Sequence, residues 1–219
     1  MIAAVRLCCQ TGHVSRISTG LNDPGRPSAG VLLVATPEIP EGEFWRSVIL
    51  LLDHDDTGSL GVILNQLTDV PVADLVPGWA HVLFPTVARG GPVSANGAVA
   101  VGRLVSPLAP DAVASEVLAG PRRRLQVVAG AWALIDLEAD PADTPPLRDA
   151  QLFAGYAGWG PGQLQSELRS GSWWVVASHA GDLRLVREMD QVSAWQAVLG
   201  RQNSDLKFAA TFPADPAHN

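Results

Sequence analysis

Gly155-Tyr156-Ala157-Gly158-Trp159-Gly160-Pro161-Gly162-Gln163-Leu164 lies between an apolar run and an amphipathic helical pattern. The segment contains four glycines, and because glycine loses the most conformational freedom on folding, this density needs a physical reason. One reason is close backbone packing around Tyr156 and Trp159, and the other is a loop whose N–H groups bind an anion. The spacing matches neither the dinucleotide-binding nor the P-loop pattern, and no lysine lies nearby, so the sequence favours close packing.

The residues on either side of this segment predict a protein made mainly of short strands. The run 151–154 is expected to lead into a glycine loop, and Pro161 to occupy the first position of a helix that Gly171 ends. The Asp-Thr-Gly sequence at 56–58 predicts a hairpin turn. Further strands are predicted over 31–35, 47–52, 61–64, 87–89, 99–101, 125–128, 133–137 and 173–177, and further helices over 71–76 and 190–199, with Asp190 as N-cap.

Strands outnumber helices in this pattern, and no regular βαβ alternation is present. The sequence therefore predicts an α+β fold rather than a doubly wound sheet. The chain of 219 residues suits one domain. Residues 1–29 contain several Gly and Pro residues without sustained periodicity, which predicts a flexible leader before a domain over 30–219.

Composition narrows the function classes. The formal net charge is -7, which argues against direct nucleic-acid binding, because non-specific affinity for nucleic acids comes mostly from Lys and Arg. The only cysteines, Cys8 and Cys9, are adjacent and unsuited to a structural disulfide, so a reducing, cytoplasmic setting is expected. No apolar run reaches the 18 residues of a membrane span, and no export signal precedes Arg6. We therefore expect no association with a membrane.

Two blocks of the chain carry a family resemblance. The first holds Ala35-Thr36-Pro37, Phe44-Trp45-Arg46-Ser47-Val48-Ile49-Leu50, His54, Gly58 and Gly61-Val62-Ile63-Leu64-Asn65. The second holds Gly155-Tyr156-Ala157-Gly158-Trp159, Gly162-Gln163-Leu164 and Glu167, and Gly90-Gly91-Pro92-Val93 lies between the two. In order and spacing these motifs resemble the YqgE/AlgH family of bacterial proteins, from about residue 30 to the C-terminus.

The resemblance implies a single compact α+β domain with a bifurcated, partly barrel-like mixed sheet flanked by helices. It implies no known reaction and carries over no catalytic residue. Family members are often labelled transcriptional regulators, after a role proposed in alginate production. After Asn65 the family usually has Arg or Lys and then Pro, whereas this chain has Gln66 and Leu67, which puts any contact made by that basic residue in doubt.

The same motifs supply a candidate surface for a ligand or partner. Arg46 is expected to bind an acidic group through its guanidinium, or to pair with Glu41, Glu43 or Asp53 and stabilise the fold. Asn65, Gly90 and Gly91 contact a ligand or shape turns, and turns are favoured. The full candidate set is Arg46, Ser47, His54, Asn65, Gly90, Gly91, Tyr156, Gly158, Trp159, Gly160 and Gln163.

Two charged runs have a functional and a structural interpretation. Asp53-His54-Asp55-Asp56 contains carboxylates of the kind that hard cations prefer, but its spacing lacks the calcium-loop pattern, so a solvated hairpin turn is favoured. Arg122-Arg123-Arg124 is the strongest basic run, and a solvated turn is favoured over a phosphate contact. The histidines are scattered, so neither a metal nor a cofactor is predicted.

The sequence thus predicts a non-catalytic cytoplasmic protein that binds a protein partner or a small ligand. Hydrolase signatures such as Gly-x-Ser-x-Gly and His-Glu-x-x-His are missing from it. Two alternatives remain: a transcriptional regulator that acts directly or indirectly, and an enzyme or nucleotide binder that uses the Gly155–Gly162 segment.

Overall fold

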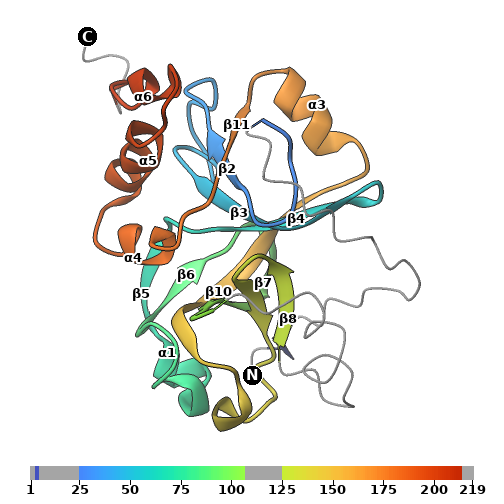
Figure 1. Cartoon of the computed structure of the whole chain (residues 1–219), viewed down its shortest axis with the longest axis vertical. Helices are drawn as coiled ribbons and strands as arrows, with labels where there is room; N and C mark the ends of the chain where they lie inside the picture. The colour runs from blue at the N-terminus through green and yellow to red at the C-terminus, as the bar shows by residue number, and fades with distance from the viewer. Residues whose placement is uncertain (1–2, 5–24, 107–124, 214–219) are drawn as a thin grey trace.

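A long strand, β10 (Leu147–Trp159), holds the structure together. The computed structural model describes residues 3–4, 25–106 and 125–213, and these form one 11-stranded mixed sheet. The sheet divides at β10: residues 157–159 pair with β4, while residues 147–156 pair with β7. Figure 1 shows the two branches that result, one above and one below this division.

The upper branch consists of antiparallel strands in the order β11-β2-β3-β4. Helix α3 covers one side of this branch, and α5 and α6 cover the other (Figure 1). The bounds are β2 (Leu32–Ala35), β3 (Val48–Asp55), β4 (Gly58–Ile63), β11 (Trp173–Val176), α3 (Gln163–Arg169), α5 (Gln191–Gly200) and α6 (Leu206–Ala209).

The lower branch is built on the long pair β7 and β10, with β9 and β8 on one side and β6 and β5 on the other. The bounds are β1 (Ala3–Ala4), β5 (Leu67–Pro71), β6 (Thr86–Arg89), β7 (Val93–Leu104), β8 (Leu125–Ala129) and β9 (Trp132–Ile135). Short helices connect the strands: α1 (Val72–Leu75), η1 (Pro77–Trp79), η2 (Pro141–Asp143) and α4 (Asp182–Leu185).

The two faces of the upper branch explain why its strands are uniformly apolar. Successive residues of a strand point to opposite faces. Leu32 and Val34 pack with Trp195 on the side of α5, whereas Leu33 packs with Leu164 on the side of α3. Because both faces are buried, the sequence shows a continuous apolar run instead of an alternating one. This run is the signal by which the strand could be predicted.

The predicted fold class is confirmed: the protein has an α+β fold with a bifurcated, partly barrel-like mixed sheet and flanking helices. Most pairs are antiparallel, and β1–β7 and β6–β10 are parallel. The hairpin turn at 56–58 and the N-cap role of Asp190 are also confirmed. No helix among the described residues is both long and apolar enough to cross a membrane.

The glycine-rich segment differs from its prediction. Instead of a loop, residues 155–159 continue β10, because Ala157, Gly158 and Trp159 pair with β4. Pro161 does not start the helix either: Gly162, with φ of 72°, is the N-cap of α3, which begins at Gln163. Pairing with a distant strand overrides the turn preference of glycine.

Close backbone packing accounts for three glycines in the two motifs. A Cβ atom on Gly90 would lie 2.2 Å from the carbonyl oxygen of Gly155, and one on Gly155 would lie 2.6 Å from that of Gly91. Gly91 is equally crowded, since its Cβ would lie 2.4 Å from the carbonyl carbon of Tyr156. The approach of 90–91 to β10 therefore requires glycine on both sides.

Part of the predicted leader falls within the described residues. Ala3 and Ala4 form β1, which pairs with Gly97 and Ala98 of β7. Gly30, where the domain is predicted to begin, donates its N–H to the carbonyl of Leu51 at 2.8 Å. Cys8, Cys9 and the basic run Arg122–Arg124 lie outside the described residues.

Candidate functional site

A cleft of about 580 Å³ opens where the start of α5 meets the beginning of β5. Trp45, Leu67 and Met189 give it an apolar component, and Met189 is 39% exposed. We call it the α5 cleft. Its lining comes from four separate segments: Gly42, Glu43, Trp45, Asn65, Gln66, Leu67, Thr68, Arg89, Met189, Asp190 and Gln191.

Asn65 fixes the walls of the α5 cleft to one another. Its Oδ1 accepts the N–H of Val48 at 2.9 Å, and its Nδ2 donates to the carbonyls of Arg46 at 2.8 Å and Gln191 at 2.9 Å. Gln191 in turn donates from Nε2 to the carbonyl of Trp45 at 2.5 Å. Asn65 is 3% exposed, so one buried amide joins β3, the end of β4 and α5, and the cleft is preformed.

Arg46 is buried and does not line the α5 cleft. The residue is 4% exposed, and its guanidinium lies 4.0 Å from the ring centroid of Trp195. Nη2 donates to the carbonyl of Pro213 at 2.8 Å, while Nε and Nη1 have no hydrogen-bond partner among the described residues. Burial lowers the pKa of Arg46. Its described contacts are thus an indole and a carbonyl rather than the carboxylates of Glu41, Glu43 or Asp53.

The residues that depart from the family pattern border the α5 cleft directly. Gln66 donates from Nε2 to the carbonyl of Glu43 at 2.6 Å, and its own carbonyl accepts the N–H of Arg89 at 2.7 Å. The side chains of Arg89 and Glu43 approach to 3.7 Å at the rim and stay largely exposed. A neutral amide therefore occupies the position where the family resemblance implies a cation.

Asp190 caps α5 at the other rim of the cleft. Its carboxylate accepts the N–H groups of Val192 and Ser193 at 2.9 Å and the hydroxyl of Ser193 at 2.7 Å. These bonds, led by that from the Ser193 side chain, lower the pKa of Asp190. A carboxyl whose pKa is lower in the folded state stabilises above its unfolded pKa, and this stability is lost as pH falls through the folded value.

We expect Asp190→Ala to lower the Tm at pH 7, because two N–H groups of the first turn lose their acceptor. The difference in Tm between Asp190→Ala and the unmodified chain should decrease as pH falls below about 4, the ordinary pKa of Asp. Thermal unfolding between pH 7 and pH 3 measures both effects. Asp190→Asn is the matched control, since the amide oxygen still accepts hydrogen bonds but does not titrate. A difference for Asp190→Ala that is constant across this range would contradict a contribution of the Asp190 charge to the cap.

A second group of candidates forms an aromatic cluster at the end of β10. Trp159 and Trp173 both donate their indole N–H groups to Oε2 of Glu167, at 2.9 and 2.7 Å. Phe44 stacks on Trp159 with ring centroids 6.5 Å apart. Gln163 donates to Oε1 of Glu167 at 2.9 Å. The junction after β10 and the segment around Phe44 therefore bury each other.

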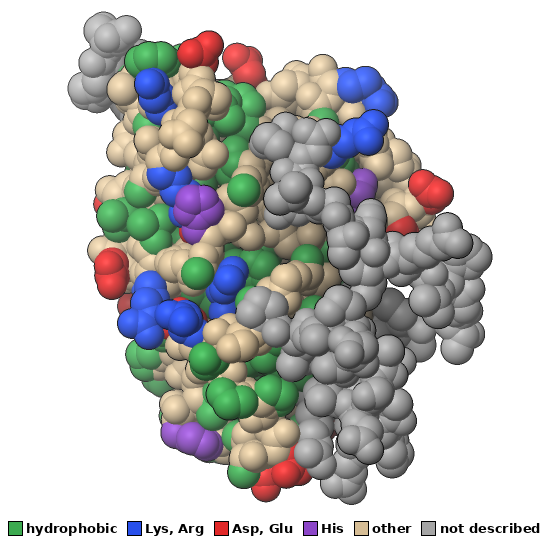
Figure 2. Space-filling model, in the orientation of Figure 1, with side chains coloured by type: hydrophobic (Ala, Val, Ile, Leu, Met, Phe, Trp, Pro, Cys, Tyr) green, Lys and Arg blue, Asp and Glu red, His purple; other side chains and the backbone are tan. Residues whose placement is uncertain are grey.

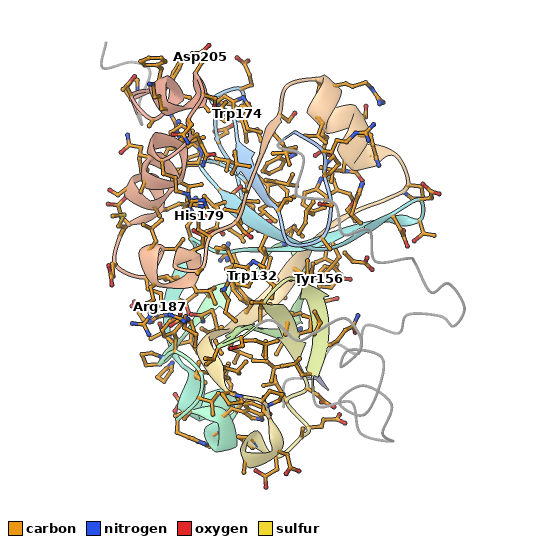
Figure 3. All side chains as sticks on the ribbon, in the orientation of Figure 1. Trp132, Tyr156, Trp174, His179, Arg187 and Asp205 are labelled. Atoms are coloured by element: carbon orange, nitrogen blue, oxygen red, sulfur yellow. The ribbon has the colours of Figure 1, made fainter. Side chains whose placement is uncertain are left out.

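The polar groups around Gly160 are used within the protein. The N–H of Gly160 donates to Oε1 of Gln163 at 3.1 Å, and its carbonyl accepts the N–H of Gln163 at 3.1 Å. Gly158 is exposed in β10, and a Cβ atom there would lie 3.4 Å from the ring of Tyr156. Tyr156 itself packs against the main core (Figure 3). These contacts favour a structural role for the segment over an anion site.

His54 and Ser47 complete the predicted set. His54 lies on the β3–β4 hairpin, where its Nδ1 is 2.7 Å from the hydroxyl of Ser59. In the same hairpin, Asp55 accepts the N–H and the hydroxyl of Thr57, at 2.7 and 2.6 Å, as expected of a solvated turn. Ser47 is buried and donates to the carbonyl of Phe44 at 2.9 Å. Within the described residues, no three His, Cys, Asp or Glu side chains are grouped to hold a metal.

Only Asn65 of the predicted candidates lines the α5 cleft. Arg46 and Ser47 directly follow the lining residue Trp45 in the chain, and Gly90 follows the lining residue Arg89. Sequence reasoning missed Trp45, Met189 and Gln191 as lining residues. Trp45 lies within the family motif that begins at Phe44, and Arg89 immediately precedes the motif that begins at Gly90. No sequence motif includes or adjoins Met189.

Comparison with known proteins identifies the family. The family model described as AlgH-like matches residues 32–207. This chain belongs to the AlgH-like family. A UPF0301 protein of Streptomyces coelicolor is 45% identical over 193 residues, covering 87% of this chain and 94% of the relative. A UPF0301 protein of Mycobacterium leprae is 35% identical over 197 residues, covering 89% and 92%.

Two solved structures share the AlgH-like fold. A crystal structure of a Corynebacterium diphtheriae protein is similar with a TM-score of 0.74 and 30% identity, covering 87% of this chain and 95% of that one. The solution structure of the AlgH protein from Pseudomonas aeruginosa has a TM-score of 0.55 at 19% identity, covering 84% and 93%. The second similarity shows the fold alone.

Proposed function

We propose that this AlgH-like protein is a non-catalytic binding protein, and that it holds a segment of a partner protein in the α5 cleft. The observation that carries the proposal is the preformed cleft, whose walls Asn65 joins by three hydrogen bonds. Because the walls are already fixed, little conformational entropy is lost when a partner binds.

The lining favours a peptide over an enclosed small molecule. The cleft is open, and its rim carries both signs of charge, from Glu43, Arg89 and Asp190. The exposed side chain of Met189 is flexible and polarizable, as is common at adaptable binding surfaces. Exposed apolar groups inside a charged rim are typical of protein–protein contacts.

A regulatory role in transcription, as the family label suggests, would act through such a partner. The net charge of -7 disfavours direct contact with DNA. A cytoplasmic location belongs to the same proposal, and it rests on the adjacent cysteines.

Site-specific photo-crosslinking in cells tests the proposal. We expect p-benzoylphenylalanine at position 189 to form a discrete protein adduct, because Met189 is exposed at the cleft. The same group at position 57 is the control, since Thr57 is exposed at the hairpin tip. Adding Gln66→Trp, which fills the cleft, should abolish the adduct at 189. The adduct partner, identified by mass spectrometry and purified, should bind Gln66→Trp at least tenfold more weakly.

Equal adducts at positions 189 and 57, or an adduct that survives Gln66→Trp, would contradict the proposal. Native mass spectrometry of the purified protein distinguishes the small-ligand alternative. If the purified protein retains a small molecule and Gln66→Trp displaces it, the occupant of the α5 cleft is that small molecule and not a protein segment.

A further inference from the structure

Three arginines gather where α4 packs on the sheet, and none of them lines the α5 cleft. Trp132, Arg103 and Asp149 are register partners on β9, β7 and β10, so their side chains share one face of the sheet. Gln151 lies two residues along β10 and shares that face. Arg184 of α4 contacts Asp149, and Arg187, just after α4, contacts Gln151. We call Arg103, Arg184 and Arg187 the arginine row.

The nearby carboxylates do not neutralise the whole row. Asp149 accepts Nε of Arg184 at 2.6 Å, and Asp182 of α4 forms an ion pair with Arg201. Arg187, in contrast, donates to neutral acceptors, at 2.8 Å to Gln151 and at 3.2 Å to Thr86. Arg103 has no hydrogen-bond acceptor within the described part of the chain. Asp182 and Asp149 also attract Arg103, but each of these carboxylates already forms an ion pair with another arginine. Among the described residues, Arg187 has no carboxylate partner and Arg103 only shares one, on a chain of net charge -7.

These two guanidinium groups are held in place and partly buried. That of Arg103 lies 4.7 Å from the ring centroid of Trp132, and that of Arg187 lies 4.7 Å from that of Phe84. Burial lowers the pKa of both arginines, so each cation is short of solvation. An anion would supply the missing stabilisation. Figure 3 shows Trp132, His179 and Arg187 on one side of the molecule, and Figure 2 shows blue side chains gathered there around α4.

We propose that the arginine row binds a small ligand with at least two linked phosphoryl groups, such as a diphosphate or triphosphate. The register places Arg103 beside Asp149. A hydrogen bond holds Arg187 at Gln151, which lies about 7 Å farther along β10 at roughly 3.3 Å per residue. Two cations anchored at this spacing along the strand suit a chain of linked phosphates better than a single phosphate. Planar guanidinium groups suit phosphate oxygens. A long nucleic acid would extend beyond the row onto a net acidic protein.

Calorimetric titration of the full chain with inorganic tripolyphosphate and with ATP tests this proposal. We expect both probes to bind, and Arg103→Gln and Arg187→Gln each to weaken binding at least tenfold. Arg169→Gln is the matched control, because Arg169 is exposed on α3 in the other branch and its loss changes the charge equally. Arg187→Lys keeps the charge and should bind more tightly than Arg187→Gln.

If Arg187→Gln fails to fold, Arg103→Gln is the deciding variant, because the guanidinium of Arg103 donates no hydrogen bond among the described residues and contacts the ring of Trp132. The proposal is overturned if neither probe binds at millimolar concentration, or if Arg169→Gln weakens binding as much as Arg103→Gln. Tighter binding of a 20-nucleotide RNA than of tripolyphosphate, lost in Arg103→Gln, would also overturn it. Gln66→Trp should leave tripolyphosphate binding unchanged, which separates this site from the α5 cleft.

Discussion

Gly155→Ala is expected to destabilise the protein by about 3 kcal/mol or more, since it combines backbone strain with overpacking. Gly155 has a φ of 70°, which disfavours any residue with a Cβ atom. The added methyl group would also lie 2.6 Å from the carbonyl oxygen of Gly91 and 2.8 Å from that of Val93. Both atoms belong to backbone, so neither can move aside without disturbing β7 or β10. Denaturant unfolding followed by tryptophan fluorescence measures the change.

Gly158→Ala provides a control within the same segment. Its Cβ would make ordinary contact at 3.4 Å with the ring of Tyr156, and its φ is not in the left-handed region. Alanine also restricts the unfolded chain, so the expected change in unfolding free energy is between zero and about 1 kcal/mol of stabilisation. Equal losses from the two substitutions would refute the close approach as the reason for glycine at 155.

Asp182→Ala is expected to cost about 3–5 kcal/mol, because it leaves a largely buried guanidinium without its counter-ion. Asp182 is fully buried, and the side chain of Arg201 is 20% exposed. The same carboxylate accepts the N–H of His179 at 2.6 Å, so the substitution also leaves a backbone donor unpaired. We expect a large fall in the midpoint of urea unfolding.

A double-mutant cycle separates the ion pair from the rest of the loss. Asp182→Ala combined with Arg201→Ala should cost less than the sum of the two single substitutions, because no lone charge remains. Asp205→Ala, at the exposed start of α6, is the matched control and should change stability by less than about 0.5 kcal/mol. Additive losses at 182 and 201 would show that the pair contributes no coupling energy.

Local patterns predicted the elements whose signals lie within a few residues. The apolar run of β3, the Asp-Thr-Gly turn after it and the N-cap Asp190 are of this kind. Each depends on burial of both sheet faces or on hydrogen bonds to the next three residues, so each is readable without knowing the fold.

The rest depends on partners far away in the chain. Residues 157–159 become a strand because β4, almost one hundred residues earlier, offers an unpaired edge. The guanidinium of Arg46 contacts the ring of Trp195 and the carbonyl of Pro213 rather than a carboxylate close in the sequence. The α5 cleft joins segments around residues 43, 66, 89 and 190. These long-range contacts depend on the topology of the fold. The local sequence pattern around each residue therefore does not predict them.

The central place of β10 has a consequence for synthesis on the ribosome. Residues 25–106 contain β2 to β7, yet β4 and β7 each keep one edge unpaired until residues 147–159 emerge. The edge of β2 stays open longer still, until β11 is made. Unpaired strand edges favour association with other chains. A nascent chain stalled before residue 147 would therefore expose these edges together, and they would be covered once β10 and β11 have emerged.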